Sequence, residues 1–253
     1  MGQIRSLSAA IVLALAVVVS FVTSAAVASR AYLRRGEQQV QLARTLEVTG
    51  SAKQPIVSDL ALWTIRTGGE GKRLEEAFRA LEETGAKVSS FLEKQGFPAD
   101  AVSPGPIRTE THYARDAKGN ETREVAAYRL VRTYGIRTKD VARVRRASSE
   151  VTELLKTGAH VESLSPEFVY TRLAELKVEM LGRAAADARD RAERIARESG
   201  CRVASVKDAR AGVLQITPPW STEVSAGGMN DTSSIEKDVT AVMRLTLVIE
   251  GRP

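Results

Sequence analysis

Apolar and polar residues alternate along the last part of the chain, between residues 239 and 250. The apolar set is Val239, Ala241, Met243, Leu245, Leu247 and Ile249. The polar residues Thr240, Arg244, Thr246 and Glu250 share the intervening positions. Successive side chains of a strand point to opposite faces, so this period of two predicts a strand with one buried and one solvated face.

Seven further stretches have the residues and the flanking turn signals of strands. They are residues 44–50, 56–67, 107–113, 125–133, 161–164, 201–209 and 212–217. Lys118, Gly119 and Asn120 lie between the third and the fourth of these stretches and suit a turn. These two strands are therefore expected to form a hairpin.

Between the strands, apolar residues recur at the three- and four-residue spacing of amphipathic helices. The first predicted helix runs from Leu74 to Leu92 and ends near Gly96. The second begins after Thr138 as its N-cap and stops at Gly158. For the third, Ser165 and Pro166 suit the N-cap and the first helical position, and the helix is expected to continue to Gly200.

This third helix combines a charged face with a face of small residues over residues 184–200. Acidic and basic residues four positions apart, such as Asp187 and Arg191, solvate its outer side. The small residues allow a sheet or another helix to approach its backbone closely. The candidate assembly face is Ala185, Ala188, Ala192 and Ala196.

The amino-terminal part, residues 1–35, is hydrophobic enough to interact with a membrane. No charged residue lies between Arg5 and Arg30, and this stretch exceeds the about 20 residues needed to span a bilayer. The length of this stretch therefore favours an uncleaved membrane anchor formed by residues 6–29. The alternative is a signal peptide cleaved near Ala28, because small residues stand there at the spacing that signal peptidase recognises.

The net charge of +6 argues against a nucleic-acid partner once its location is considered. Residues 1–35 contain four arginines and no acidic residue, so the rest of the chain has 37 − 4 = 33 basic and 31 acidic residues, a net charge of +2. Phosphate backbones are bound by concentrated basic faces. The 43% hydrophobic content is enough for an ordinary core in one or two domains.

The sequence predicts no catalytic, cofactor or metal site. The glycine-rich stretch 67–73 lacks the spacing of a phosphate-binding loop, and His112, His160 and Cys201 do not form a metal-ligand pattern. The long segment 217–237 is rich in Pro, Gly and Ser and is a candidate binding loop. Its candidate contact residues are Trp220 and Met229, although Trp220 could instead pack beneath the loop.

Two groups of residues resemble the SIMPL-domain family of bacterial exported proteins, over about Leu42 to Gly251. The first group is Lys177, Met180, Asp187, Ala188, Arg189, Ala192, Ala196 and Gly200. The second is Val48 to Gly50 followed by Asp59, Leu60 and Ala61. The chain departs from the family after Gly200, where Val203 and Ala204 replace a common Leu-Gly pair. This departure weakens the expectation for the turn after Gly200 but not for the fold.

The resemblance implies an α+β fold of two lobes, with antiparallel sheets packed against three main helices. The expected arrangement is a domain over residues 36–253 with lobes at 42–133 and 134–253, after the membrane segment. The arginines that follow this segment favour a cytoplasmic domain, but the family is exported, so a periplasmic domain on a single-pass inner-membrane anchor is expected. Cleavage near Ala28 would leave it soluble in the periplasm.

The resemblance also implies a protein without established catalytic residues, which self-assembles in some members and is loosely associated with stress tolerance. A non-enzymatic, membrane-tethered homo-oligomer with no cofactor is therefore expected. The alternative is a monomeric binding module that captures a small molecule or peptide with the loop 217–237.

Overall fold

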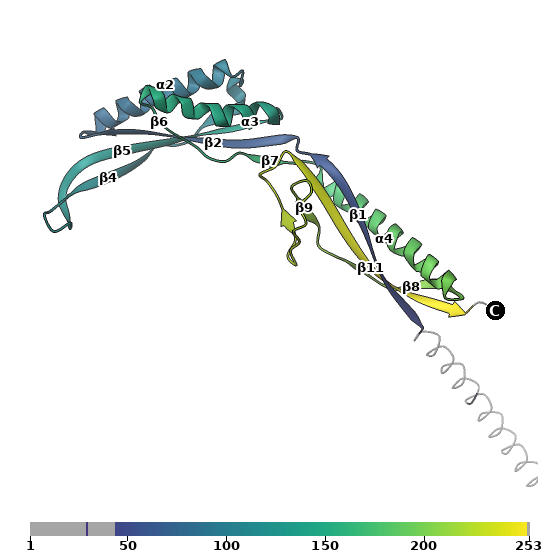
Figure 1. Ribbon diagram of the computed structural model, residues 1–253. Coiled ribbons are helices and arrows are strands. Elements are labelled where there is room, and N and C mark those ends of the chain that lie inside the picture. Colours follow the sequence, from purple (N-terminus) through teal and green to yellow (C-terminus); the bar gives the residue numbers. More distant parts are fainter. Residues whose placement is uncertain (1–28, 30–43, 252–253) are drawn as a thin grey trace, which may run out of the picture. The chain divides into compact units, whose positions relative to one another are not determined.

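The computed structural model describes Ser29 and residues 44–251 as an α+β protein with two sheets and three helices, α2, α3 and α4 (Figure 1). The predicted membrane segment lies outside the described residues except for Ser29. None of the helices within the described part has the length and apolar character needed to cross a bilayer.

The described elements follow one another in this order. The helices are α2 (Leu74–Lys94), α3 (Val141–Glu150) and α4 (Leu173–Glu198), with short 3-10 helices at Ala99–Ala101 and Val151–Thr157. The strands are β1 (Thr45–Val57), β2 (Leu60–Gly71), β3 (Val102–Pro104), β4 (Arg108–Arg115), β5 (Glu121–Thr138), β6 (His160–Ser163), β7 (Glu167–Val169), β8 (Cys201–Ala211), β9 (Gln215–Thr217), β10 (Met229–Asn230) and β11 (Glu236–Gly251).

The described residues form two compact units, each assembled from separate parts of the chain. Unit 1 takes residues 44–52, Leu181–Gly212 and 242–251, whereas unit 2 takes Lys53–Met180 and Val213–Ala241. These units differ from the lobes expected from the sequence. The expected boundary after residue 133 falls inside β5, which pairs with β2 without a break from Tyr128 to Thr138.

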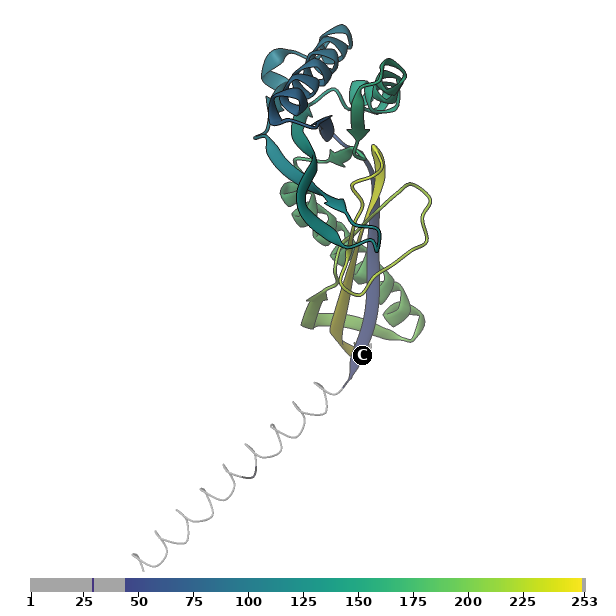
Figure 2. The same cartoon turned by 90° about the vertical axis from the view of Figure 1, so that its left-hand side faces the viewer.

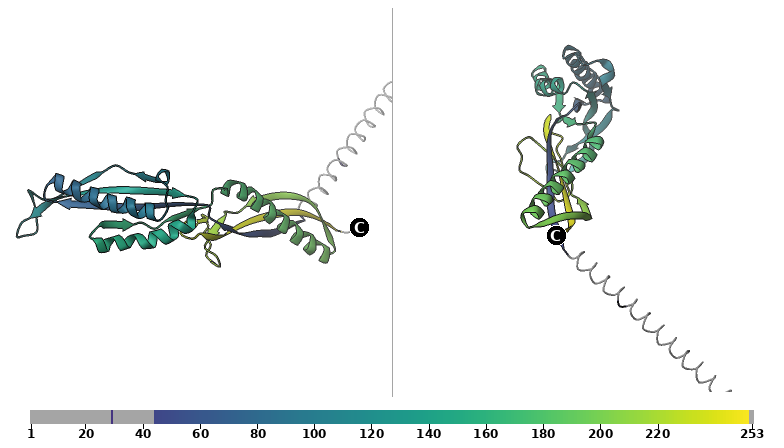
Figure 3. Two further views of the ribbon diagram at one scale, coloured as in Figure 1. Left: turned by 90° about the horizontal axis from the view of Figure 1, so that it is seen from above. Right: turned by 90° about the vertical axis from the view of Figure 1, so that its right-hand side faces the viewer.

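Unit 2 contains a six-stranded sheet with β2 and β5 at its centre. β3 and β4 pair with the outer side of β5, while β6 and β7 pair with the outer side of β2, and all five pairings are antiparallel. Helices α2 and α3 lie side by side over one face of this sheet (Figure 3). The main core of unit 2 lies between them and includes Trp63, Ile65, Val88, Ile136 and Val144.

Unit 1 packs the second part of α4 against β1, β8 and β11 (Figure 2). Its core contains Val48, Ala188, Leu245 and Leu247. β8 pairs antiparallel with β11, as far as Cys201 opposite Gly251. The predicted alternation of β11 is confirmed up to Leu247, and an irregularity of the pairing on each side of residues 247–248 buries Val248 as well.

Several predicted elements are confirmed, among them α2 and the β4–β5 hairpin, but the start of the third helix is wrong. Residues 167–169 form β7 on the edge of β2, with Phe168 buried, so α4 begins only at Leu173. An apolar partner for Phe168 in the core of unit 2 therefore outweighs the helix-start signal at Ser165 and Pro166.

Three other boundaries also differ from the sequence predictions. The N-cap of α3 is Asp140, whose carboxylate accepts a hydrogen bond from Arg143 N at 2.9 Å, while Thr138 accepts one from Asp140 N. The strand predicted over 56–67 is interrupted after Val57, and the strand predicted over 212–217 contains only the residues of β9. At the break after Val57, the backbone N–H groups of Ser58 and Asp59 donate to the carbonyl oxygens of Ile235 and Val169, which are distant in the sequence.

Candidate functional site

The structure places most of the candidate assembly face inside unit 1. Ala188 and Ala192 are fully buried and Ala196 is 2% exposed, and the first two pack with Leu245 and Leu247. Ala185 stands beside this stripe and is only half-buried. The helical spacing of the alanines was predicted correctly, but their partner is the chain's own sheet, so a second copy cannot reach them.

A glycine on β1 explains why this face of α4 is made of alanines. A Cβ atom on Gly50 would lie 2.2 Å from Ala188 N and 2.3 Å from the carbonyl oxygen of Ala184, both in α4. The strand backbone thus rests directly on the helix backbone, and larger residues would separate them. Ala184, which is fully buried, takes the place on this stripe that the sequence assigned to Ala185.

A hydrogen bond also connects β1 to α4 beside this contact. Ser51 N donates to Asp187 Oδ2 at 2.8 Å, and Asp187 also pairs with Arg191 at 2.9 Å. The hydrogen bonds from Ser51 and then Arg191 lower the pKa of the Asp187 carboxyl. The two motifs that carry the family resemblance, around Gly50 and around Asp187, therefore contact each other and have a structural role in unit 1.

The candidate binding loop presents one of its two predicted contact residues to solvent. Trp220 is 91% exposed and has a φ of 66°, which L residues rarely adopt, so it does not pack beneath the loop. Its backbone N donates to Asp238, which pairs with Lys53 at 2.9 Å. Met229 lies apart from this turn, in the short strand β10 that pairs with β9.

A buried lysine fastens the end of the loop to the sheet of unit 2. The side chain of Lys237 is 2% exposed, and its Nζ donates to the carbonyl oxygens of Phe168, at 2.8 Å, and of Asp231. Burial lowers the pKa of Lys237, while the carboxylate of Asp231 3.8 Å away opposes this shift. Because its donors have acceptors, we assign Lys237 a structural role, which sequence reasoning missed within the polar loop.

The face of the six-stranded sheet opposite α2 and α3 is not covered by any helix of unit 2 (Figure 1). We call it the open face. The strand register brings arginine and glutamate together on it: Arg129 lies between Glu110 and Glu70, and Arg66 lies opposite Glu162, with which it pairs at 2.6 Å. Arg66 and Arg129 also line a cavity of about 640 Å³ on this face.

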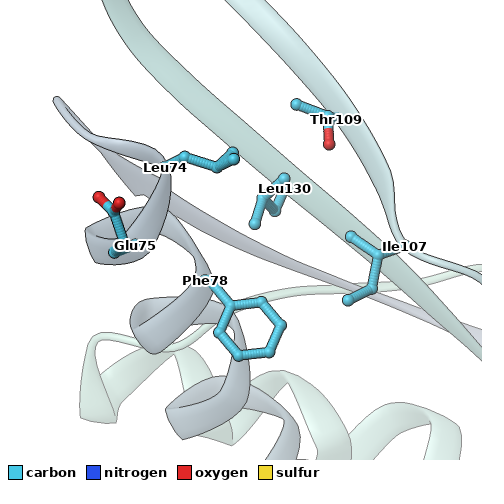
Figure 4. A pocket seen from close by; sticks show the side chains of 6 residues that line it. All are labelled: Leu74, Glu75, Phe78, Ile107, Thr109 and Leu130. Carbon is cyan, nitrogen blue, oxygen red and sulfur yellow. The ribbon is translucent and has the colours of Figure 1, made fainter.

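Two further cavities of unit 2 lie on the helix side of the sheet. The smaller, of about 370 Å³, lies between the start of α2 and the β4–β5 hairpin, where Leu74 and Phe78 face Ile107 and Leu130 (Figure 4). The larger, of about 610 Å³, lies at the end of α2 and is lined by residues that include Phe97 and Tyr134. Sequence reasoning missed both cavities, although Gly85 in the middle of α2 is a signal for close packing there.

The histidines and the cysteine remain separate in the structure. Within residues 44–251, no three side chains of His, Cys, Asp or Glu are grouped as metal ligands. His112 lies on β4, His160 begins β6, and Cys201 begins β8 in the other unit. These residues therefore supply no geometry from which a reaction can be derived.

Comparisons with solved structures give only weak similarities. A de novo designed protein, Foldit4, is 16% identical with a TM-score of 0.21, covering 42% of this chain and 93% of its own. A hydantoinase/carbamoylase family amidase from Burkholderia ambifaria is 13% identical with a TM-score of 0.24, covering 46% of this chain and 29% of its own. An uncharacterized conserved protein from Listeria innocua is 8% identical with a TM-score of 0.18, covering 78% and 92%. None of these similarities supports an inference about fold or activity.

The sequence comparisons are more informative. No curated protein matches the chain. A family model does match, over residues 46–247, and its description is SIMPL, protein of unknown function (DUF541). The match includes both motif groups that contact each other in unit 1. The chain therefore belongs to the SIMPL family, whose function is unknown.

Proposed function

We propose that this SIMPL protein is a non-enzymatic envelope protein, anchored in the inner membrane by residues 6–29, whose periplasmic domain self-associates through the open face. The anchor is supported by the 24 uncharged residues between Arg5 and Arg30. Cleavage near Ala28, giving a soluble periplasmic protein, is the alternative, and the mass of the mature protein distinguishes the two. The proposed link to stress tolerance rests on the family resemblance alone.

The observation that supports self-association is the charge pattern of the open face. Its residues include Arg66, Arg108, Arg129 and Arg137 together with Glu70, Glu110, Glu162 and Glu167. In a twofold interface the same patch must complement itself, which requires both signs of charge on one surface. Equal numbers of arginines and glutamates in neighbouring rows satisfy this requirement.

The size of the open face is also suitable for a second copy. β3 and β4 share one edge of β5, and β6 and β7 share one edge of β2, so the six-stranded sheet is only four strands wide. Its width is therefore about 19 Å at the usual strand spacing, and the 12 residues of β2 extend about 40 Å. The product, about 760 Å², is close to the about 800 Å² per partner of a standard protein interface. The apolar side chains of Leu62 and Val131 lie among the charges and add burial that a purely charged face would lack.

The test is the protein mass of the full chain in a mild detergent, measured by light scattering. We expect a discrete multimer that dissociates to the monomer in Arg129→Glu, because this change places a third carboxylate between Glu110 and Glu70 in place of a cation. The matched control is Arg79→Glu on α2, an exposed arginine outside the open face, which should retain the multimer. A monomeric parent protein, or equal masses for both variants, would contradict the proposal.

A second candidate function is peptide capture by the loop 217–237, which the 91% exposure of Trp220 favours. Exposed tryptophans are frequent anchors of protein contacts. Selection from a library of random hexapeptides tests this function: the parent chain should enrich a common motif, and Trp220→Ala should lose it while keeping the same thermal unfolding curve. Equal enrichment by both chains would rule out this role for Trp220.

A further inference from the structure

The cavity of about 610 Å³ in unit 2 has the size and the lining of a small-molecule site. It lies where the end of α2 meets the 3-10 turn at Ala99–Ala101 and the strands β3 and β5. Leu92, Phe97 and Val102 form its apolar side. The first two belong to the main core, with 2% and 6% exposure, so this wall is held in place by the fold and not by the cavity's occupant.

The hydroxyl group of Tyr134 lies on the wall of this cavity. Tyr134 is 7% exposed, and its hydroxyl forms no hydrogen bond with any of the described residues. A Cβ atom on Gly85 would lie 2.5 Å from this hydroxyl, so the glycine leaves the space that the hydroxyl occupies against α2. A tyrosine hydroxyl can both donate and accept a hydrogen bond, so this one is available to a polar group of a ligand in the cavity.

The charge of the lining selects for a cation. Among the described residues that line the cavity, Glu93 is the one with a formal charge, and its carboxylate has no ion pair within the described part of the chain. The guanidinium of Arg143 lies 5.9 Å from the ring centre of Phe97, but it is paired with Asp140 at 2.9 Å. Glu93 is therefore available to a positively charged ligand.

We propose that this cavity binds a small amphipathic amine. Its apolar body packs against Leu92, Phe97 and Val102, its ammonium group pairs with Glu93, and a second polar group bonds to the hydroxyl of Tyr134. This site is separate from the open face and does not depend on self-association. A cavity that is mostly apolar, with a few convergent polar groups, is the usual form of such sites.

Tyramine is a suitable probe because it carries an aromatic ring, an ammonium group and a phenol hydroxyl. Its binding to the full chain in phosphatidylcholine nanodiscs can be followed by saturation-transfer NMR, with empty nanodiscs as the blank. We expect saturable binding of tyramine, weaker binding of phenethylamine, which lacks the hydroxyl, and the weakest binding of 3-(4-hydroxyphenyl)propionate, which carries a carboxylate in place of the amine.

Variants assign the binding to this cavity. Glu93 is exposed, so Glu93→Gln should weaken tyramine binding about fivefold, the upper range for an exposed ion pair. Glu83→Gln, an exposed glutamate of α2 outside the cavity, should have no effect. Tyr134→Phe should remove the difference between tyramine and phenethylamine. Absence of saturable binding, equal binding of the propionate, or an unchanged affinity in Glu93→Gln would each overturn the proposal.

Discussion

The contact between Gly85 and Tyr134 allows a quantitative test of the packing in unit 2. Gly85 lies in the middle of α2, where glycine is about 1 kcal/mol less favourable than alanine. The structure gives the reason for this glycine, because an added Cβ would lie 2.5 Å from the hydroxyl oxygen of Tyr134. The next nearest atom, the ring carbon Cζ, would be at 3.7 Å, which is ordinary van der Waals contact.

The free energies follow from these two distances. Gly85→Ala alone gains about 1 kcal/mol of helix propensity but forces a buried ring to move, and overpacking of this kind costs about 1 to 3 kcal/mol. We therefore expect a net effect between neutral and about 2 kcal/mol destabilising. In a Tyr134→Phe background the obstructing oxygen is absent, so the same substitution should stabilise by about 1 kcal/mol. The predicted coupling energy is about 1 to 3 kcal/mol.

The measurement is urea unfolding of the four proteins of this double-mutant cycle, followed by far-UV circular dichroism. Gly182→Ala on α4 is the control for helix propensity, since no atom lies within 4 Å of the position of its Cβ and it should stabilise by about 1 kcal/mol in every background. A coupling below about 0.5 kcal/mol would refute the reasoning, because it would mean that the hydroxyl does not occupy the space beside Gly85.

Three further predictions concern unit 1 and the loop. Gly50→Ala should destabilise by at least about 2 kcal/mol and speed hydrogen exchange in α4, because its Cβ meets helix backbone at 2.2 Å; unchanged exchange would refute this. Asp187→Asn should lower the urea midpoint at pH 7. Since the folded state lowers the Asp187 pKa, this stabilisation is present above the ordinary carboxyl pKa of about 3.9, and the gap from the parent should shrink as the pH falls below it. Trp220→Phe should remove most acrylamide-quenchable fluorescence, since Trp63 is 2% exposed; a persisting quenchable component would contradict the exposure of Trp220.

The parts of the fold that could be predicted from the sequence are those whose signal lies within a single segment of the chain. The alternation in β11, the helical spacing in α2 and the turn residues between β4 and β5 are all such local signals. The start of α4 was mispredicted because β7 forms only through its pairing with β2. The two units were also unpredictable from local patterns, since each combines segments that are distant in the sequence.

The candidate sites also depend on contacts between distant segments, which local sequence patterns do not show. A helical wheel reveals that Ala188 and Ala192 share a face but cannot identify what covers that face, which is the sheet of unit 1. The cavity beside Tyr134 combines residues 89–104 with a strand about 30 positions later, so no local motif marks it. Its one sequence signal is Gly85, which has a structural reason only once Tyr134 is placed beside it.

The same glycine contact occurs in both units and explains why glycines stand at positions 50 and 69 of this chain. On β1, a Cβ on Gly50 would meet Ala188 N at 2.2 Å and Ala184 O at 2.3 Å. On β2, a Cβ on Gly69 would meet Leu81 N at 2.2 Å and Ala77 O at 2.4 Å. In each case a strand glycine rests on the helix backbone between residues four positions apart, which is one hydrogen-bonded turn.

This repeated contact changes where self-association should be sought. Because the small residues of α4 are used to bring its backbone onto β1, substitutions such as Ala188→Glu would bury an unpaired charge and unfold unit 1 whether or not the protein assembles. Loss of assembly in such a variant would therefore carry no information about an interface. The open face of unit 2 does not have this ambiguity, since Arg129 is exposed and can be replaced without disturbing a core.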